Sequence, residues 1–308
     1  MLLSLIAALT LASDTPYSDP HADARPISWS DLLDRPRENA NVRIPYGEGQ
    51  HEFGELWLPD GDGPFPLVVM IHGGCWLSQI PGTILQDYLA ADLRARGVAV
   101  WNLEYARIGH DTGAYPGTFL DVAAGVDHVR ELAQAYPLKT DSIVFTGHSA
   151  GGHLALWAAA RATLPDDHRF HSDDPMRAST VITLAGINDL EDYRDNGPGR
   201  CGEPATVDNL MGGQFNPALL SQISPAHMPL VSAELIVISG ELDPIVPPEF
   251  GERFGDHVRS QSGEARTLIL DGAGHFELID PTSPAWQTIV DHLLDALSVD
   301  TPAGDNLP

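Results

Sequence analysis

Short, continuously apolar runs alternate with longer segments of helical periodicity along most of the chain. The runs occupy residues 66–74, 98–105, 142–147, 179–186, 233–240 and 265–272. The segments with helical periodicity occupy residues 84–97, 118–136, 150–162, 247–261 and 284–297. A continuous apolar run is typical of a strand that is buried on both faces. The alternation therefore predicts an α/β fold, in which helices flank a mostly parallel central sheet.

The pattern differs before the first apolar run. Residues 42–59 contain two strand-like stretches around Gly47–Gln50, which predicts an antiparallel hairpin. Residues 13–40 are rich in Asp, Pro and Arg, and we interpret them as a linker or a loosely packed arm. We expect a single α/β domain over residues 41–297, followed by a C-terminal tail at residues 298–308.

One long segment, residues 187–232, interrupts the alternation between two predicted core strands. It contains many Gly, Pro and Asn residues and no clean strand pattern. We predict an insertion over one edge of the sheet, because a long irregular segment in a compact domain often forms a lid over a functional site. A connection without a function is the alternative. The acidic side chains of Asp189, Glu191 and Asp192 would favour cationic or polar substrates if they faced a site, but a solvated loop is the preferred interpretation.

The turn after the run at 142–147 has the sequence Gly-His-Ser-Ala-Gly, with the serine at position 149. A G-x-S-x-G turn between a strand and a helix is tight, so its flanking residues must be small, and it lifts the serine hydroxyl clear of the sheet. The N-terminus of the following helix offers free N–H groups and a dipole that favour negative charge. We therefore predict that Ser149 is a nucleophile rather than part of a packing turn.

A nucleophilic serine needs a general base, which is commonly a histidine held by a carboxylate. In this kind of sheet the chain order is serine, acid, histidine. The histidines that follow the serine are at positions 153, 168, 171, 227, 257, 275 and 292. His275 is the preferred base because it follows the run at 265–272 in a glycine-flanked loop. His153 lies in the helix after the serine and is interpreted as a packing residue.

The acid is expected just after the run at 233–240. Asp243 lies there and precedes Pro244, a rigid turn residue that would fix the carboxylate toward His275. This placement agrees with the chain order of the triad. Glu241 and Asp271 are the alternatives.

A hydrolytic serine also needs donors for the oxyanion of the tetrahedral intermediate. The sequence His-Gly-Gly-Cys-Trp follows the run that ends near residue 71, and its small residues let backbone N–H groups approach a substrate. We predict that the donors are the N–H groups of Gly74 or Cys75 together with that of Ala150. His72 is expected to brace the loop. Trp76 either lines an acyl pocket or belongs to the core.

Four motifs together resemble those of the α/β-hydrolases. They are IHGGCW from residue 71, GHSAGGHLA from residue 147, GELDPIVP from residue 240 and GAGHFEL from residue 272. They are most similar to the esterase/formamidase branch with an HGG-x-W loop, which includes carboxylesterases, feruloyl-esterase-like enzymes and kynurenine formamidases. Residues 104–129 are also similar to the segment before the nucleophile strand in that group.

The resemblance covers about residues 41–297 and implies the α/β-hydrolase fold with a short lid-like insertion, and a Ser149–His275–Asp243 triad. It implies acyl transfer in two steps, without a metal or an organic cofactor. The chain departs from hormone-sensitive-lipase relatives at Cys75, where they carry a third glycine. This side chain keeps the backbone donor but narrows the pocket, which disfavours bulky acyl groups.

The composition excludes several partners. The chain has 17 Lys and Arg against 43 Asp and Glu, and its formal net charge is -26. Such a surface repels phosphate backbones, so we expect no nucleic-acid partner, and it also disfavours anionic membranes. Two cysteines, Cys75 and Cys201, are too few for a four-ligand zinc site. They form a disulfide if their spacing allows it, and otherwise leave a free thiol near the chemistry.

The first residues predict export. Residues 1–12 are apolar but too short to span a bilayer, and Thr10–Ala12 places small residues at the spacing of a signal-peptidase site. We expect cleavage after Ala12 and a periplasmic or secreted protein without an integral membrane segment in the mature chain. If residues 1–12 are not cleaved, the protein is cytoplasmic.

Three functions remain open at this point. The first is a serine esterase for small to medium acyl groups, acting on a small-molecule ester. The second is an arylformamidase that hydrolyses N-formylkynurenine, and the export signal favours the esterase over it. The third is a non-catalytic binding protein on the same fold, which the complete set of motifs disfavours. The oligomeric state is left open.

Overall fold

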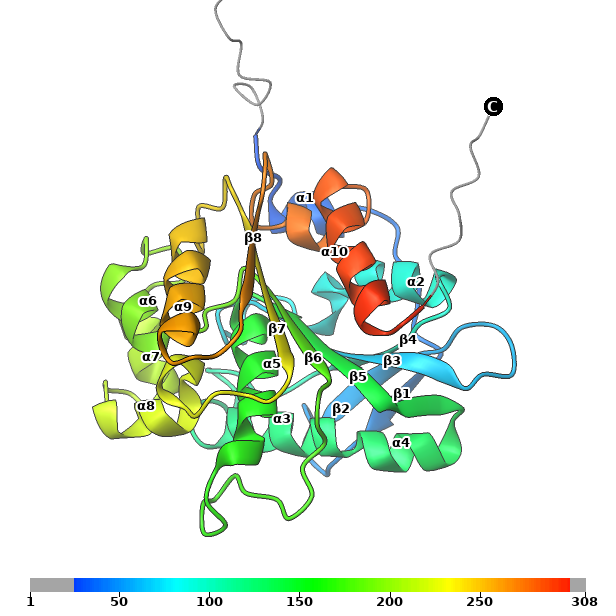
Figure 1. Cartoon of the computed structure of the whole chain (residues 1–308), viewed down its shortest axis with the longest axis horizontal. Coiled ribbons are helices and arrows are strands. Elements are labelled where there is room, and N and C mark those ends of the chain that lie inside the picture. Colours follow the sequence, from blue (N-terminus) through cyan, green and yellow to red (C-terminus); the bar gives the residue numbers. More distant parts are fainter. Residues whose placement is uncertain (1–24, 300–308) are drawn as a thin grey trace, which may run out of the picture.

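A computed structural model describes residues 25–299, and its centre is a single eight-stranded sheet with the strand order β1-β2-β4-β3-β5-β6-β7-β8 (Figure 1). The strands are β1 Val42–Pro45, β2 Phe53–Trp57, β3 Phe65–Ile71, β4 Ala99–Leu103, β5 Leu138–His148, β6 Thr180–Leu184, β7 Glu234–Gly240 and β8 Arg266–Leu270. Strands β1 and β2 are antiparallel to their neighbours, and all pairs from β4 to β8 are parallel. The predicted hairpin and the mostly parallel sheet are therefore confirmed.

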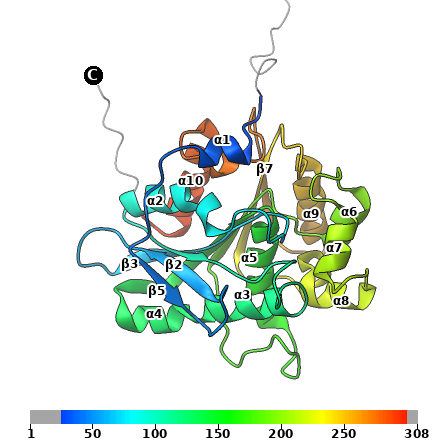
Figure 2. The same cartoon turned by 180° about the vertical axis from the view of Figure 1, so that it is seen from behind.

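Helices cover both faces of the sheet. They are α1 Trp29–Leu33, α2 Asp87–Ala95, α3 Gly117–Asp127, α4 Val129–Ala135, α5 Ala150–Ala160, α6 Leu190–Asn196, α7 Ala205–Leu210, α8 Pro217–Ile223, α9 Pro248–Ser260 and α10 Pro284–Ala296. Helices α1, α2 and α10 gather on one face, and α3, α4, α5 and α9 gather on the other (Figures 1 and 2). Helices α6, α7 and α8 lie beside α9 at the edge that ends in β8.

The core lies between these layers and explains the continuous apolar runs. Every residue of β4 and β6 is buried, and five consecutive side chains of β3, from Leu67 to Ile71, are fully buried. Because a strand in the middle of the sheet has helices on both faces, most of its side chains are apolar, and its few polar ones, such as Asn102 of β4 and Thr183 of β6, are buried. Burial of each such aliphatic side chain contributes about 1.5–3 kcal/mol.

The arm predicted at residues 13–40 is more ordered than a linker where the structure describes it. Ser28 caps α1 with its side chain, and the only fully buried residue of that helix is Leu32. Arg35 forms an ion pair with Asp280 at 2.5 Å, and the N–H of Ile27 donates to a Glu277 oxygen at 2.6 Å. The prediction of a loosely packed arm is wrong for this part, because the composition gave no sign of these distant partners.

The insertion at residues 187–232 contains three short helices, α6, α7 and α8, joined by irregular segments. Asp189 caps α6 by accepting from two backbone N–H groups, and Asn216 caps α8, which begins at Pro217. These cap residues are the Asn, Asp and Pro that made the segment resemble a loop. Two of the acidic side chains predicted to be solvated therefore have structural contacts. Asp189 caps α6, and Asp192 accepts a hydrogen bond from Arg253 at 2.8 Å.

Three sequence predictions extend beyond the described residues, and the arm is one of them, because its residues 13–24 are not described. Residues 1–12, predicted as a cleaved leader, and residues 300–308 of the predicted tail lie outside the described residues. Between residues 25 and 299, none of the helices has the length and apolar character that a bilayer crossing needs.

Candidate active site

The turn between β5 and α5 holds Ser149 in a strained conformation. Its φ of 57° and ψ of −121° place a non-glycine residue in a region that L-residues avoid. A Cβ on Gly147 would overlap the backbone of Gly151, and a Cβ on Gly151 would overlap the carbonyl oxygen of Ile71. The two glycines of G-x-S-x-G are therefore required by the close approach of three backbone segments. The turn buries Ser149, which is 2% exposed.

The His-Gly-Gly loop after β3 packs directly against this turn. A Cβ on Gly73 would lie 2.6 Å from the carbonyl oxygen of His148 and 3.1 Å from the Cβ of Ser149. The next residues, Gly74 and Cys75, have positive φ values of 104° and 51°. Within residues 25–299, the backbone N–H groups of Gly74, Cys75 and Ala150 donate to no acceptor. These are the three amides that the sequence proposes as oxyanion donors.

His275 and Asp243 meet across two loops at the carboxyl ends of β8 and β7. The Nδ1 of His275 lies 2.6 Å from Oδ2 of Asp243, and each residue is 4% exposed. The other oxygen, Oδ1, accepts the backbone N–H groups of Ile245 at 2.7 Å and Val246 at 2.9 Å. Because the carboxylate can only accept, Nδ1 carries a proton and donates it, which leaves Nε2 as the basic nitrogen.

The alternative acids do not occupy this position. Glu241 accepts the backbone N–H of Gly272 at 2.7 Å, so it braces the loop that carries His275. Asp271 is exposed at the end of β8. Of the three acids considered from the sequence, the structure brings Asp243 to His275.

His148, the second residue of the G-x-S-x-G turn, is a site residue that the sequence reasoning did not single out. Its Nε2 lies 2.9 Å from the carbonyl oxygen of His275, and the two rings are 4.2 Å apart between centroids. Full burial, and then the charge of His275, lower the pKa of His148 well below its usual value. His148 is therefore neutral and donates from Nε2, which ties the His275 loop to the nucleophile turn.

A cluster of buried charged residues contacts the loop after β3, residues 72–76, which we call the oxyanion loop. The His72 ring contacts the carbonyl oxygen of Gly73 at 2.8 Å and a Glu104 oxygen at 2.9 Å, and the hydroxyl of Tyr105 donates to the carbonyl of His72 at 2.8 Å. Arg107 lies 3.5 Å from the same carboxylate and donates to the loop carbonyl of Ile80. Burial alone would raise the pKa of Glu104, but the charge and hydrogen bond of His72 and the charge of Arg107 lower it to about 2. The expected bracing role of His72 thus has a structural basis.

This cluster could have been found in the sequence from one signal. Glu104 and Arg107 are charged residues directly after a continuously apolar strand, where a parallel sheet gathers its functional groups. They lie within residues 104–129, which the family resemblance covers, but that stretch by itself assigns them no partner.

Trp76 is fully buried, which favours the second of its two sequence interpretations. Its indole N–H donates to Nδ1 of His153 at 3.2 Å, and Nε2 of His153 donates to the carbonyl of Ile223 at 2.6 Å. Burial lowers the pKa of His153 to about 4, so the ring is neutral and can accept from Trp76. Trp76 therefore joins the oxyanion loop to α5 and, through His153, to α8.

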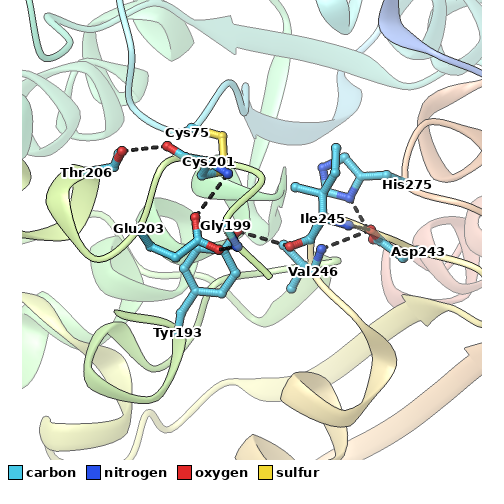
Figure 3. Close-up of a disulfide and its surroundings, with 10 residues drawn as sticks. All are labelled: Cys75, Tyr193, Gly199, Cys201, Glu203, Thr206, Asp243, Ile245, Val246 and His275. Carbon is cyan, nitrogen blue, oxygen red and sulfur yellow. Dashed lines mark hydrogen bonds and ion pairs between the residues drawn. A yellow bond between two sulfur atoms is a disulfide. The ribbon is translucent and has the colours of Figure 1, made fainter. Parts of the chain in front are cut away.

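Cys75 and Cys201 form a disulfide, with a Cα–Cα distance of 5.5 Å across 126 residues of sequence (Figure 3). The bond joins the oxyanion loop to the insertion, and it leaves no free thiol among residues 25–299. In the same part of the chain, no group of three or more His, Cys, Asp or Glu side chains is arranged to hold a metal ion.

Comparison with known proteins identifies the family. The BD-FAE family model matches residues 55–257. The chain is 31% identical to a kynurenine formamidase of Danio rerio, over 77% of this chain and 75% of that protein. It is 25% identical to esterase LipC of Mycobacterium tuberculosis, over 77% of this chain and 60% of LipC. The chain thus spans less than two thirds of LipC.

Solved structures show the same fold. Esterase B from Lactobacillus rhamnosis superimposes with a TM-score of 0.74 at 19% identity, covering 87% of this chain and 90% of that one. A truncated carbohydrate esterase from gut microbiota gives a TM-score of 0.69 at 18% identity, covering 85% of this chain and 97% of that one. From the family match and the fold together, the chain belongs to the BD-FAE family and is an α/β-hydrolase of the esterase and formamidase type.

Proposed function

We propose that this chain is a serine hydrolase that cleaves carboxylic esters of small to medium acyl groups. One observation carries the proposal: a strained, buried Ser149 shares the carboxyl edge of the sheet with a His275–Asp243 pair whose Nε2 is the basic nitrogen. The esterases among the relatives and the structural neighbours support the same reaction class. The roles below are the roles that this geometry supports best.

The first step forms an acyl-enzyme. Nε2 of His275 accepts the hydroxyl proton of Ser149 while Oγ attacks the ester carbonyl carbon. The resulting oxyanion accepts hydrogen bonds from the free amides of Gly74 or Cys75 and of Ala150, and each such donor typically contributes a few kcal/mol. The bond to the leaving alkoxide then breaks, and His275 returns its proton to that oxygen.

The second step releases the acid. Water enters, His275 takes one of its protons, and the hydroxide attacks the acyl carbon. Asp243 stabilises the imidazolium through Nδ1 in both steps and stays ionised. The acyl–Oγ bond breaks, Ser149 regains its proton, and the carboxylic acid leaves. Each bond that forms in the two steps is matched by a bond that breaks, and the proposed steps use neither a metal nor a redox group.

Two features support the finer parts of the proposal. The side chain at Cys75 replaces the glycine of related lipases, and its sulfur is tied to Cys201, so it occupies space beside the oxyanion donors and favours small acyl groups. We also infer that the protein is exported, because structural disulfides are typical of oxidising compartments. Retention of residues 1–12 in a cytoplasmic protein would contradict that inference.

Arylformamidase activity is the second candidate, and the similarity to a kynurenine formamidase favours it. The same Ser149, His275 and Asp243 would cleave a formamide, with an amine in place of the alkoxide as the leaving group. The two reactions differ in substrate pocket rather than in chemistry, so a direct comparison of substrates decides between them.

The test measures turnover of p-nitrophenyl acetate, butyrate and octanoate and of N-formylkynurenine by the purified chain. We expect ester turnover that falls from acetate to octanoate and little formamide cleavage. The Ser149→Ala variant should lose at least about 10³-fold in kcat. Preferred turnover of N-formylkynurenine would replace the esterase by the formamidase. Equal activity in wild type and Ser149→Ala, or a wild type that a fluorophosphonate does not label, would refute the serine mechanism.

A further inference from the structure

The insertion touches both halves of the candidate active site through different contacts. One end is covalently bound to the oxyanion loop by the Cys75–Cys201 disulfide. A second part of the insertion contacts the turn after β7 that carries Asp243, residues 241–246, which we call the acid turn. This contact is made by Tyr193 of α6, which is fully buried. Figure 3 shows these two contacts on either side of the same short segment, residues 193–206. We call this segment the clamp.

The contact with the acid turn is specific. The hydroxyl of Tyr193 donates to the carbonyl oxygen of Ile245 at 3.0 Å, and the N–H of the same Ile245 donates to Oδ1 of Asp243 at 2.7 Å. Ile245 therefore accepts from the Tyr193 hydroxyl with its carbonyl and donates to the Asp243 carboxylate with its N–H. Burial, followed by the negative charges of Glu203 and Asp243, raises the pKa of Tyr193, so the hydroxyl keeps its proton and remains a donor.

Hydrogen bonds within the clamp hold the turn that carries Cys201, and so they support the contact with the oxyanion loop. Glu203 accepts the backbone N–H of Cys201 at 3.0 Å and that of Gly199 at 2.6 Å. Thr206 donates to the carbonyl of Cys201. The buried Cys201 thus lies in a turn whose backbone is held by hydrogen bonds on both sides. Because Cys75 is covalently bound to Cys201, this turn also restricts the motion of Cys75.

The two contacts are joined within the clamp. Gly197 packs between the carbonyl of Tyr193 and the side chain of Glu203, and a Cβ there would clash with both. A continuous set of covalent, hydrogen-bonded and packed groups therefore runs from Cys75 through Cys201, Glu203 and Tyr193 to the acid turn. Coupling of this kind requires physical contact at each step, and here each step is present.

We propose that the clamp positions the oxyanion loop and the acid turn relative to one another, with Tyr193 as a positioning residue and the disulfide as a redox-sensitive tie. This inference rests on the proposed serine hydrolysis and names the groups that position the same site. A dithiol breaks the S–S bond by supplying two electrons and two protons, and it becomes a cyclic disulfide while Cys75 and Cys201 become thiols. Cys75 then moves independently of the clamp, and its N–H is less well aimed at the oxyanion.

The first experiment reduces the purified full chain with dithiothreitol and measures kcat and KM on p-nitrophenyl acetate. We expect kcat to fall about 10-fold with KM nearly unchanged, because a displaced oxyanion donor weakens the transition state more than the bound substrate. Cys201→Ser should have the same low kcat and should show no further response to dithiothreitol. Near-ultraviolet circular dichroism and thermal unfolding establish that each sample is folded.

The second experiment removes one hydroxyl and leaves the disulfide intact. Tyr193→Phe should lower kcat about 3- to 10-fold, since a small misplacement of a catalytic group can cost up to about 100-fold. Tyr88→Phe is the matched control: it loses a similar hydroxyl-to-carbonyl bond, at 3.0 Å to Arg35, which joins α2 to the segment after α1 rather than to the turn of Asp243. We expect Tyr88→Phe to retain full kcat.

The outcomes separate this inference from the proposed function. The rate at which a fluorophosphonate labels Ser149 is measured in parallel, because it reports nucleophile and oxyanion donors whatever the natural acyl group is. Unchanged kcat and unchanged labelling in both folded, reduced protein and Tyr193→Phe would overturn the clamp while leaving the hydrolase intact. If reduction unfolds the protein, Tyr193→Phe alone decides. A wild type without labelling would refute the hydrolase itself.

Discussion

The nucleophile turn and the acid–base loops form one site, yet they are held in different ways. The turn around Ser149 is fixed by backbone segments in direct contact, and Gly147, Gly151 and Gly73 are the positions where a Cβ would collide with a neighbouring backbone. The loops that carry Asp243 and His275 also meet through backbone at Gly240, but their two side chains are held by hydrogen bonds from separate parts of the chain. Close backbone packing therefore dominates around Ser149, whereas side-chain hydrogen bonds place Asp243 and His275.

This difference determines how each half responds to change. Backbone contact leaves no room for adjustment, so a single added methyl group in the turn must displace a strand or a helix. A hydrogen-bonded loop can lose one contact and keep its remaining contacts, so its catalytic geometry degrades by degrees. We expect substitutions in the turn to abolish the site and substitutions around the loops to weaken it.

The largest effect is expected for Gly151→Ala. Its Cβ would overlap the carbonyl oxygen of Ile71, which is backbone in the middle of the sheet and cannot move away alone. Overpacking of this kind typically costs about 1–3 kcal/mol and sometimes more. We expect a lower free energy of unfolding by at least that amount, measured in urea, together with loss of fluorophosphonate labelling at Ser149.

Gly61→Ala is the control for this substitution. Gly61, unlike Gly151, has a positive φ, of 112°, and no atom lies within 4 Å of the added Cβ. Backbone strain alone should then cost about 1–2 kcal/mol and leave labelling of Ser149 unchanged. If Gly151→Ala behaves like Gly61→Ala, close packing is not what fixes the nucleophile turn.

The same difference explains what the sequence could predict. The candidate nucleophile turn is encoded in five adjacent residues, and the candidate oxyanion loop in five more, so local motifs were enough to propose Ser149, Gly74 and Cys75. Continuous apolar runs identify the sheet because burial on two faces leaves a local trace. Asp243 and His275 follow core strands, and chain order then pairs them. These predictions needed no knowledge of which distant residues meet.

Contacts between residues that lie far apart in the sequence leave no such local pattern. The bond from His148 to the His275 carbonyl joins residues 127 positions apart, and the Tyr193 contact with Ile245 spans 52 positions. In both contacts the acceptor is a backbone carbonyl, which every residue type carries, so the residue types could not specify the partner. The same limit applies to the disulfide, for which the sequence offered two cysteines but no distance between them.

The next effect in size is expected at the junction of the two halves, at His148. His148→Ala removes the donor to the carbonyl of His275 and the ring whose centroid lies 4.2 Å from that of the His275 imidazole. The His275 loop should then sample other positions, and we expect kcat to fall about 30-fold with a small change in KM, within the range for misplaced catalytic groups. Steady-state kinetics on p-nitrophenyl acetate check this.

His148→Gln separates positioning from mere packing. A glutamine amide can donate to the same carbonyl of His275, so it should restore most of the kcat that His148→Ala loses. If the Gln variant is as slow as the Ala variant, the hydrogen bond does not position His275. If both variants retain wild-type kcat, the nucleophile turn and the acid–base loops are not coupled through this residue.

The smallest effect concerns the pH dependence of stability, through His153. Burial lowers the pKa of this ring from 6.5 to about 4, so the ring is neutral and accepts from Trp76. Between these two pH values the unfolded chain binds a proton that the folded chain does not, so stability falls as the pH falls. The contribution is complete above about pH 6.5, and we expect about 1–2 kcal/mol of it to be lost between pH 7 and pH 5.

His153→Gln isolates this contribution, since the amide can still accept from Trp76 and donate to Ile223 but cannot be protonated in this range. Urea unfolding at pH 7 and pH 5 gives the free energy for both proteins, and the decrease should be smaller in the variant. His148 is also buried and neutral, so part of the decrease remains. Equal decreases in both proteins would mean that His153 is not kept neutral by its contacts, and that the bond from Trp76, which joins the oxyanion loop to α5, is not sensitive to acid.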